Sequence, residues 1–220
     1  MNINLIITTA VIPEENHQEK LGYSYSERKK QYIDTFNSVK QFKDNFKTIT
    51  ILETVSKEPI DFLDESGFNV YYSKKDNFFL NKGLNEMIHI NDFIKNIDEN
   101  EFFLKISGRY LINNLNLIKY IKNDKIKIIA KNSADIYVGN YNGVHTFYFL
   151  SNIKKFYEFY NYINLDFTKN DDKQWICIEW ILKDFIDKDK ECLILPDTVE
   201  VGCKAMLYSK EIDRWTIKNV

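Results

Sequence analysis

The sequence has little glycine and little proline, with 7 and 3 residues respectively among 220. Because disordered chains and turn-rich all-β proteins use these residues heavily, their scarcity argues against both classes. Hydrophobic residues make up 44% of the chain and aromatic residues 15%, and a chain of this length can bury a sizeable core. The composition therefore predicts one globular domain.

Cysteine, net charge and long hydrophobic runs are also scarce. The three cysteines, Cys177, Cys192 and Cys203, fit neither a zinc spacing nor a disulfide framework. The formal net charge is -2, so no overall field would attract anionic lipid, and no nucleic-acid partner is expected. No apolar run approaches the length of a membrane span, and residues 1–7 lack a basic leader. We expect a cytoplasmic protein without a transmembrane segment, of open oligomeric state.

The order of apolar and amphipathic segments predicts an α/β fold. Apolar strands are expected over residues 4–9, 48–53, 68–72 and 101–106. Capping or spacing signals indicate intervening helices that begin near Ser24, Pro59 and Asn81. Such alternation implies right-handed crossovers and a mixed, mostly parallel central sheet flanked by helices.

The second half of the chain has a different pattern. A helix and three strands are expected over residues 115–121, 127–130, 136–138 and 144–150. The dipeptide Asn142-Gly143 predicts the turn of an antiparallel hairpin. Two amphipathic helices follow, the first capped by Ser151 and the second by Asp171 or Asp172. A strand over 191–195 and an irregular tail complete a domain with a Rossmann-like N-terminal half.

Candidate ligand-binding residues lie where the parallel strands end, which is where open α/β sheets bind their ligands. These positions combine hydroxyls, a carboxylate and two cations, in Thr8, Thr9, Ala10, Glu53, Lys105, Gly108 and Arg109. Gly108 lets the backbone approach a ligand closely, and the guanidinium of Arg109 can bind two phosphate oxygens at once. A hydroxyl-lined turn, a carboxylate for ribose and a basic turn for phosphate together predict a nucleotide pocket.

Two helix starts add positive charge to the same region. Arg28 lies in the first turn of the first helix, and Asn81-Lys82-Gly83 opens a later one. Helix N-termini attract anions through their free N–H groups and their dipole. Each basic residue can equally be a solvated surface group, and Glu53 can be an exposed loop acid.

This arrangement resembles bacterial and large-virus glycosyltransferases of the GT-A type. The similarity rests on the segment 8–10 after the first strand, on Asn81-Lys82-Gly83, and on Lys105-x-x-Gly108-Arg109-Tyr110 after the fourth strand. It covers residues 1–150 in the order of elements. The resemblance implies a single GT-A-like domain in which residues 1–112 bind a nucleotide-sugar and residues 113–220 form the acceptor side.

The same resemblance implies substrates and a possible cofactor. The donor would be a UDP-, GDP- or CMP-linked sugar, and the acceptor a glycan, glycolipid or protein glycan, as in polysaccharide biosynthesis. Members of this family usually hold Mn²⁺ or Mg²⁺ with an Asp-x-Asp after the fourth strand, where this chain has residues 105–109. No cofactor is therefore firmly implied, because protein cations can neutralise the diphosphate. We interpret the literal Asp187-Lys188-Asp189 as a solvated turn.

Inverting transfer needs a carboxylate that takes the proton of the acceptor hydroxyl, and three candidates exist. Glu179 lies at the edge of an apolar helical face beside Trp180. Asp172 resembles the acid that many of these transferases place at the start of an acceptor-side helix. Asp135 has only its place before a strand in its favour. Glu179 can equally be a helix-edge acid paired with a lysine, and Asp172 an ordinary N-cap.

Other chemistries lack their usual signatures. The sequence has no Walker A motif and no G-x-G-x-x-G, and the histidines His17, His89 and His145 have no ligand or triad spacing. The leading hypothesis is a glycosyltransferase without a strict metal requirement. A sugar-phosphate nucleotidyltransferase is an alternative, although residues 8–13 lack the glycine-rich basic loop typical of that class. A non-catalytic nucleotide-sugar-binding or assembly domain is a further alternative, since the Asp-x-Asp is missing.

Overall fold

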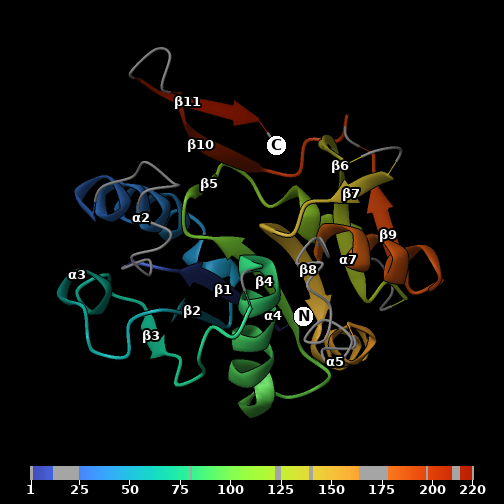
Figure 1. Cartoon of the computed structure of the whole chain (residues 1–220), viewed down its shortest axis with the longest axis horizontal. Coiled ribbons are helices and arrows are strands. Elements are labelled where there is room, and N and C mark those ends of the chain that lie inside the picture. The colour runs from blue at the N-terminus through green and yellow to red at the C-terminus, as the bar shows by residue number, and fades with distance from the viewer. Residues whose placement is uncertain are drawn as a thin grey trace.

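A computed structural model describes residues 2–11, 25–79, 81–121, 125–138, 141–163, 178–196, 198–209 and 214–219, with the backbone alone for 133–138, 141–142, 204–209 and 214–219. Its central sheet has the strand order β3-β2-β1-β4-β8-β6-β7, with β9 paired to β6 (Figure 1). The strands are β1 (Ile3–Thr9), β2 (Thr48–Glu53), β3 (Asn69–Tyr72), β4 (Phe102–Ser107), β6 (Ile128–Val138), β7 (Tyr141–Val144), β8 (Tyr148–Asn152) and β9 (Cys192–Leu195). A smaller sheet contains β5 (Tyr110–Ile112), β10 (Cys203–Ser209) and β11 (Arg214–Asn219).

Helices cover both faces of the central sheet (Figure 1). They are α2 (Tyr25–Lys40), α3 (Asp61–Asp64), α4 (Lys82–Phe93), α5 (Ile153–Tyr162) and α7 (Ile178–Asp187), with the 3₁₀ segments η1 (Lys43–Asn45), η2 (Ile94–Asn96) and η3 (Asn116–Tyr120). Side chains alternate along a strand, so Leu5 and Ile7 of β1 pack with α2 and α3, whereas Ile6 packs with α4 and α7. The strand is buried along its whole length because both faces are covered.

The predicted α/β class is confirmed, and the N-terminal half follows the predicted elements closely. β1 pairs in parallel with β2 and with β4, and β2 pairs in parallel with β3. α4 begins after Asn81, whose side-chain oxygen accepts a hydrogen bond from the Leu84 amide at 3.2 Å. The continuous apolar runs and the cap are local signals, which explains why the sequence predicts them well.

The C-terminal half contains several corrections. Asn142-Gly143 lies within β7 and is not the hairpin turn, because Val138 already pairs with Tyr141 and the antiparallel register continues from there. The expected strands 127–130 and 136–138 are parts of one strand, β6, with an irregular register between Ser133 and Tyr137. The strand predicted over 144–150 is likewise divided between β7 and β8.

Other corrections concern caps and short elements. The cap of α5 is Asn152 and not Ser151, since the Asn152 side chain accepts from the Lys155 amide at 3.2 Å. The helix predicted over 115–121 is the 3₁₀ segment η3. The expected irregular tail contains β10 and β11, and β10 pairs with β5, far away in sequence. Ser24, Asp171 and Asp172 lie outside the described residues. Within the described ranges, no helix has the length and apolarity needed to cross a membrane.

Candidate functional site

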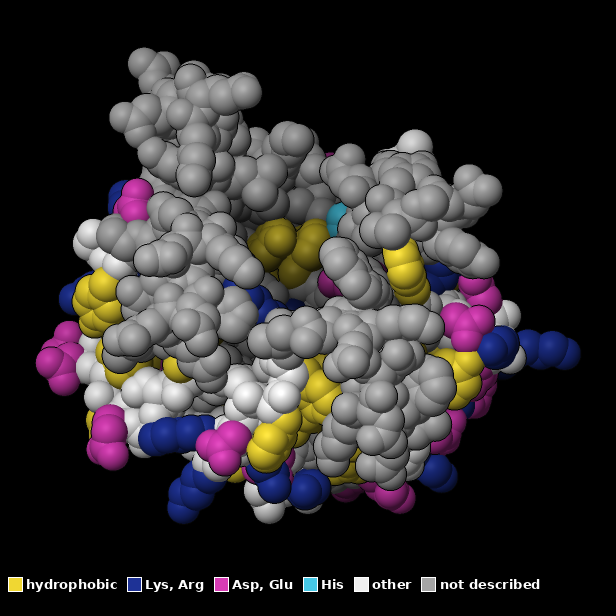
Figure 2. All heavy atoms as spheres, viewed as in Figure 1, with side chains coloured by type: hydrophobic (Ala, Val, Ile, Leu, Met, Phe, Trp, Pro, Cys, Tyr) yellow, Lys and Arg dark blue, Asp and Glu magenta, His cyan; other side chains and the backbone are white. Residues whose placement is uncertain are grey.

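A cavity of about 260 Å³ lies at the carboxyl ends of β1, β2 and β4. Figure 2 shows this face hollowed near its centre, with basic, acidic and hydrophobic side chains inside the hollow. The cavity wall includes most of the residues predicted to bind a ligand: Thr8, Thr9, Ala10, Arg28, Lys82, Gly83, Gly108, Arg109 and Glu179. It lies where the topology of an open α/β sheet predicts a ligand site.

Two arginines form the basic wall of the cavity. Arg28 is 3% exposed, and its Nη1 donates to the Ala10 carbonyl at 3.0 Å, while its Nε is buried without a hydrogen-bond partner. Arg109 is half-buried and also lines the cavity. Both arginines act on Tyr32: burial raises the pKa of its hydroxyl, and the positive charges of Arg109 and Arg28 oppose that rise. The wall therefore presents concentrated positive charge in a partly dehydrated place.

Gly108 allows the turn after β4 to lie close to α2. Its amide donates to the Thr8 carbonyl at 2.8 Å, and a Cβ at this position would come within 2.6 Å of the Tyr32 ring. Gly83, in the first turn of α4, meets a similar limit, because a Cβ there would lie 2.3 Å from Cγ2 of Ile178. These two glycines are used for close packing, which keeps backbone amides at the cavity wall.

The cavity lining also contains two carboxylates. Glu86 of α4 accepts hydrogen bonds from Thr8 Oγ1 and, at 2.9 Å, from the ammonium of Lys105. Glu179 of α7 is half-buried, and one of its oxygens accepts from Thr146 Oγ1 at 3.0 Å. The cavity lining thus combines cations and acids.

Lys105 does not reach the cavity, which contradicts the prediction that it contacts a diphosphate directly. Its side chain is 0% exposed, and its ammonium donates to Glu86, to Ser107 Oγ at 2.8 Å and to the Thr146 carbonyl at 2.8 Å. Lysine follows the alternation of β4, so its side chain points between the sheet and α4 and not toward the turn. All three donors of its ammonium are already used.

The carboxylate of Glu53 is also used in hydrogen bonds within the protein. It is 0% exposed, and its carboxylate accepts from Thr9 Oγ1 at 2.7 Å and from three backbone amides, those of Val11, Val55 and Ser56, at 3.0 to 3.3 Å. The predicted role in binding ribose hydroxyls is therefore not supported by this arrangement. Glu53 instead fixes the loops that follow β1 and β2, because a buried carboxylate needs such donors.

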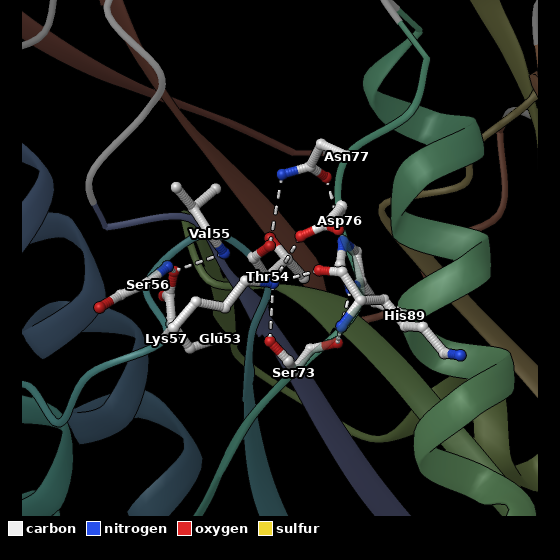
Figure 3. A network of polar contacts seen from close by, with 10 residues as sticks. Glu53, Thr54, Val55, Ser56, Lys57, Ser73, Asp76, Asn77 and His89 are labelled. Carbon is white, nitrogen blue, oxygen red and sulfur yellow. Dashed lines mark hydrogen bonds and ion pairs between the residues drawn. The ribbon is translucent and has the colours of Figure 1, made fainter.

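A polar chain behind the cavity fixes the segment after β3. Figure 3 shows Ser73, His89 and Asn77 in a row: Ser73 Oγ lies 2.7 Å from His89 Nδ1, and His89 Nε2 lies 3.0 Å from Asn77 Oδ1. Asn77 also donates to the Thr54 carbonyl at 3.4 Å. Burial, together with the charge of Lys57, lowers the pKa of His89 to about 4. The neutral ring thereby positions Asn77 and Thr54, which both line the cavity.

Phe79 lines the cavity together with Thr54 and Asn77. Asn85 is buried in α4, and its side chain bonds the Phe79 amide at 3.0 Å and the Phe79 carbonyl at 2.6 Å. This two-point contact holds the segment before α4 against the cavity. Phe78, its neighbour, is exposed to 67%. The wall formed by Thr54, Asn77 and Phe79 offers amide and aromatic surface of the kind that suits a nucleobase.

Among the remaining predicted residues, those whose side chains the structure describes do not line the cavity. Asn81 caps α4. Asp135 lies in β6, where the structure describes the backbone only, and Asp172 lies outside the described residues. Asp187 and Asp189 are bonded to Lys183 and Lys155 respectively. The described ranges contain no group of three His, Cys, Asp or Glu side chains that could hold a metal ion.

Sequence reasoning missed several cavity residues, and helical periodicity could have found two of them. Tyr32 lies one turn after Arg28, and Glu86 lies one turn after Lys82. Side chains four residues apart share a helix face. Asn77, by contrast, lies in an irregular segment between β3 and α4, and no local pattern marks it.

Comparisons with known proteins identify the fold. No model of a known protein family matches the sequence, and no curated protein matches it. A putative glucose-1-phosphate thymidylyltransferase from Bacillus anthracis, solved with sucrose, has a TM-score of 0.52 at 12% identity, over 93% of this chain and 89% of that chain. The inositol-1-phosphate CTP transferase of T. maritima has a TM-score of 0.52 at 13% identity, over 89% of this chain and 84% of that chain.

A glycosyltransferase involved in glycosylation of the major capsid of PBCV-1 has a TM-score of 0.48 at 12% identity, over 89% of this chain and 82% of that chain. That score is too low to support an argument. At the identities of the two transferases above, likeness extends to the fold alone. The chain therefore has the mixed α/β fold of these nucleotidyltransferases, a central sheet flanked by helices.

Proposed function

We propose that the protein is a glycosyltransferase that moves a sugar from a nucleotide-diphosphate sugar to a glycan, glycolipid or protein-glycan acceptor, without a strict metal requirement. The observation that carries this proposal is the convergence of Arg28, Arg109 and Lys82 on a cavity that Glu179 also lines. The cations suit a diphosphate leaving group, and the acid suits a hydroxyl acceptor.

The donor would lie across the N-terminal half, residues 1–112. Its base and ribose fit against Thr54, Asn77 and Phe79, and its diphosphate fits against Arg28 and Arg109. The amides at the start of α4 add to the positive potential. A UDP-, GDP- or CMP-linked sugar is compatible with this division of the cavity.

The reaction would proceed by displacement at the anomeric carbon. As the acceptor oxygen forms its bond to that carbon, Glu179 takes the hydroxyl proton, and the bond between the carbon and the diphosphate oxygen breaks. The electron pair leaves with the diphosphate, whose growing negative charge Arg109 and Arg28 stabilise. Asp172 and Asp135 remain alternative bases on the acceptor side, residues 113–220.

The first experiment is a nucleotide panel. We expect UDP, GDP or CMP, or one of their sugars, to raise the melting temperature of the wild-type protein, because a ligand that binds only the folded state stabilises it. The shift should persist in EDTA and change little when Mn²⁺ is added. No shift with any nucleotide or nucleotide-sugar would rule out the proposal.

A second experiment separates sugar transfer from nucleotidyl transfer. A glycosyltransferase hydrolyses its nucleotide-sugar slowly to a nucleotide and a free sugar, whereas a nucleotidyltransferase releases pyrophosphate from a nucleoside triphosphate and a sugar phosphate. Glu179→Gln should lower transfer by on the order of 100-fold or more, while Glu65→Gln, at an exposed position after α3, should leave it unchanged. Equal activity of both variants would show that another residue is the base.

A further inference from the structure

Lys105 lies directly behind the cavity in a cage of three oxygen atoms. The cage consists of Glu86 Oε2 at 2.9 Å, Ser107 Oγ at 2.8 Å and the Thr146 carbonyl at 2.8 Å. These contacts account for the three N–H donors of a charged ammonium. The side chain has no exposed surface and no donor left for a substrate.

The cage connects the two acidic groups of the cavity wall. Glu86 is bonded on one side to Lys105 and on the other to Thr8 Oγ1. Thr146 accepts from Lys105 through its carbonyl and donates through its hydroxyl to Glu179 at 3.0 Å. One ammonium therefore links α4, the segment before β8 and the acid on α7.

Lys105 and Glu86 form a largely buried ion pair. Burial lowers the pKa of the Lys105 ammonium, and the groups that face it and oppose this change are Glu86 on α4, Glu179 on α7 and Cys203 at the start of β10. Only Glu86 is in direct contact as a carboxylate. The desolvation of a buried ion pair offsets much of its attraction, so the position of Lys105 at this site needs an explanation other than stability.

We propose that Lys105 is a built-in cation that positions Glu86 and, through Thr146, Glu179 around the substrate without touching it. This inference rests on the proposed function in that the positioned groups act in sugar transfer. Lys105 is then a positioning residue.

The kinetic test compares Lys105→Met with Lys155→Met. Lys155 is a matched control because it is also a buried lysine with three acceptors, Glu158, Asp189 and Glu191, at 2.7 to 2.9 Å, but it lies at the other end of the sheet. We expect Lys105→Met to lower kcat about 100-fold with little change in donor KM, as a small displacement of a reacting group does. The acid limb of its pH profile should move to higher pH, because loss of a positive charge favours neutral carboxyl groups. Lys155→Met should change neither kcat nor the pH profile.

A chemical rescue tests the cage itself. Lys105→Ala removes the atoms of propylamine, so propylamine should raise its melting temperature saturably and restore turnover, whereas propanol, which is similar in shape but neutral, should do neither. Propylamine should not act on Lys105→Met, whose cavity is filled. If Lys105→Ala does not fold without amine, refolding with and without propylamine gives the same measurement. The double variant Lys105→Ala/Glu86→Gln lacks the counter-charge and should not respond.

Two results would overturn the inference: a Lys105→Met enzyme that loses stability but keeps its kcat and pH profile, or equal effects of propanol and propylamine on Lys105→Ala. If the wild type turns over no nucleotide-sugar, the proposed function fails by itself. The melting temperatures, measured without substrate, then decide the cation site: a charge-specific, saturable shift supports it and no shift overturns it.

Discussion

Lys105 of β4 and Lys155 of α5 are two buried lysines near opposite ends of the parallel strands, which we call the cavity edge and the Lys155 edge, and their surroundings differ. Burial alone would lower the pKa of Lys155, but the hydrogen bonds that its ammonium donates to Glu158, Glu191 and Asp189 raise it above its usual range. Lys105 has one carboxylate contact, and its pKa is lowered. At the Lys155 edge one ammonium therefore contacts three carboxylates, whereas Lys105 contacts one.

The larger of the two hollows lies at the Lys155 edge. The hollow at the Lys155 edge has a volume of about 860 Å³, against about 260 Å³ for the cavity at the other edge. Its Glu101, however, is bonded to Lys47 and to Asn4, and its Lys155 is saturated. The smaller cavity keeps an arginine nitrogen without a partner. A buried arginine nitrogen without a hydrogen-bond partner, and not a larger volume, therefore distinguishes the candidate site.

The largest effect is expected from the removal of Arg109 at the cavity edge. We expect Arg109→Ala to lower the affinity for a nucleoside diphosphate by on the order of 100- to 1000-fold, because charge-assisted bonds to phosphate are strong in a partly dehydrated site. Calorimetry with the nucleotide that gives the largest thermal shift measures this. Lys47→Ala, which removes a cation from the other edge, should bind normally. Normal binding by Arg109→Ala would show that the site lies elsewhere.

As the pH falls, the structure around the cavity should lose stability before the structure around Lys155. The pKa of His89 falls from 6.5 to about 4 on folding, so the unfolded chain binds the proton more readily, and stability present above pH 6.5 is lost as the pH falls toward 4. This change of about 2.5 units corresponds to at most about 3 kcal/mol in the free energy of unfolding. The Lys155 edge should persist, since hydrogen bonds from Lys155 keep the pKa of Asp189 below its usual value.

Urea unfolding at several pH values measures this loss. His89→Gln removes the titrating ring, so its stability should depend less on pH between 4 and 6.5 than that of the wild type. Lys57, Glu86, Asp76 and Asp92 also influence His89 and are unchanged in the variant. Parallel curves for the two proteins would show that His89 does not cause the acid sensitivity.

A methyl group at Gly108 should disturb the cavity edge by overpacking. The added Cβ of Gly108→Ala would meet the buried Tyr32 ring at 2.6 Å, and we expect a loss of about 1–3 kcal/mol in stability together with weaker nucleotide binding. Gly67→Ala is the control: Gly67 has a φ of 82° but open space around it. That variant should lose about 1 kcal/mol and bind normally. Unfolding curves and the thermal shift with nucleotide measure both effects.

The smallest effect is expected at the other edge. Lys155→Met leaves three acids without their partner, but these acids are 26% to 52% exposed and water can solvate them. We expect a loss of about 1–2 kcal/mol in stability, discounted for that exposure, and unchanged nucleotide affinity. A large loss of affinity would show that the two edges are coupled.

Local patterns in the sequence determined much of the first half. The apolar runs of β1, β2 and β4 and the Asn81 cap are properties of a few neighbouring residues, and they predict the strands, the helix start and the edge at which ligands bind. The same reasoning located Arg28 and Arg109 at one cavity. It failed for Asn142-Gly143, which lies within β7 and pairs with β6, and for β5, because its partner β10 is distant in the chain.

The sequence by itself thus determined the α/β class and the cations that converge at the end of the sheet. Only the tertiary structure decided which polar groups face the cavity and which are used by the protein. Lys105 and Glu53 have the right chemistry for a ligand, but packing turns them inward, where Glu86 and backbone amides bind them first. Burial and partner choice depend on contacts between distant segments, and one residue's identity cannot specify them.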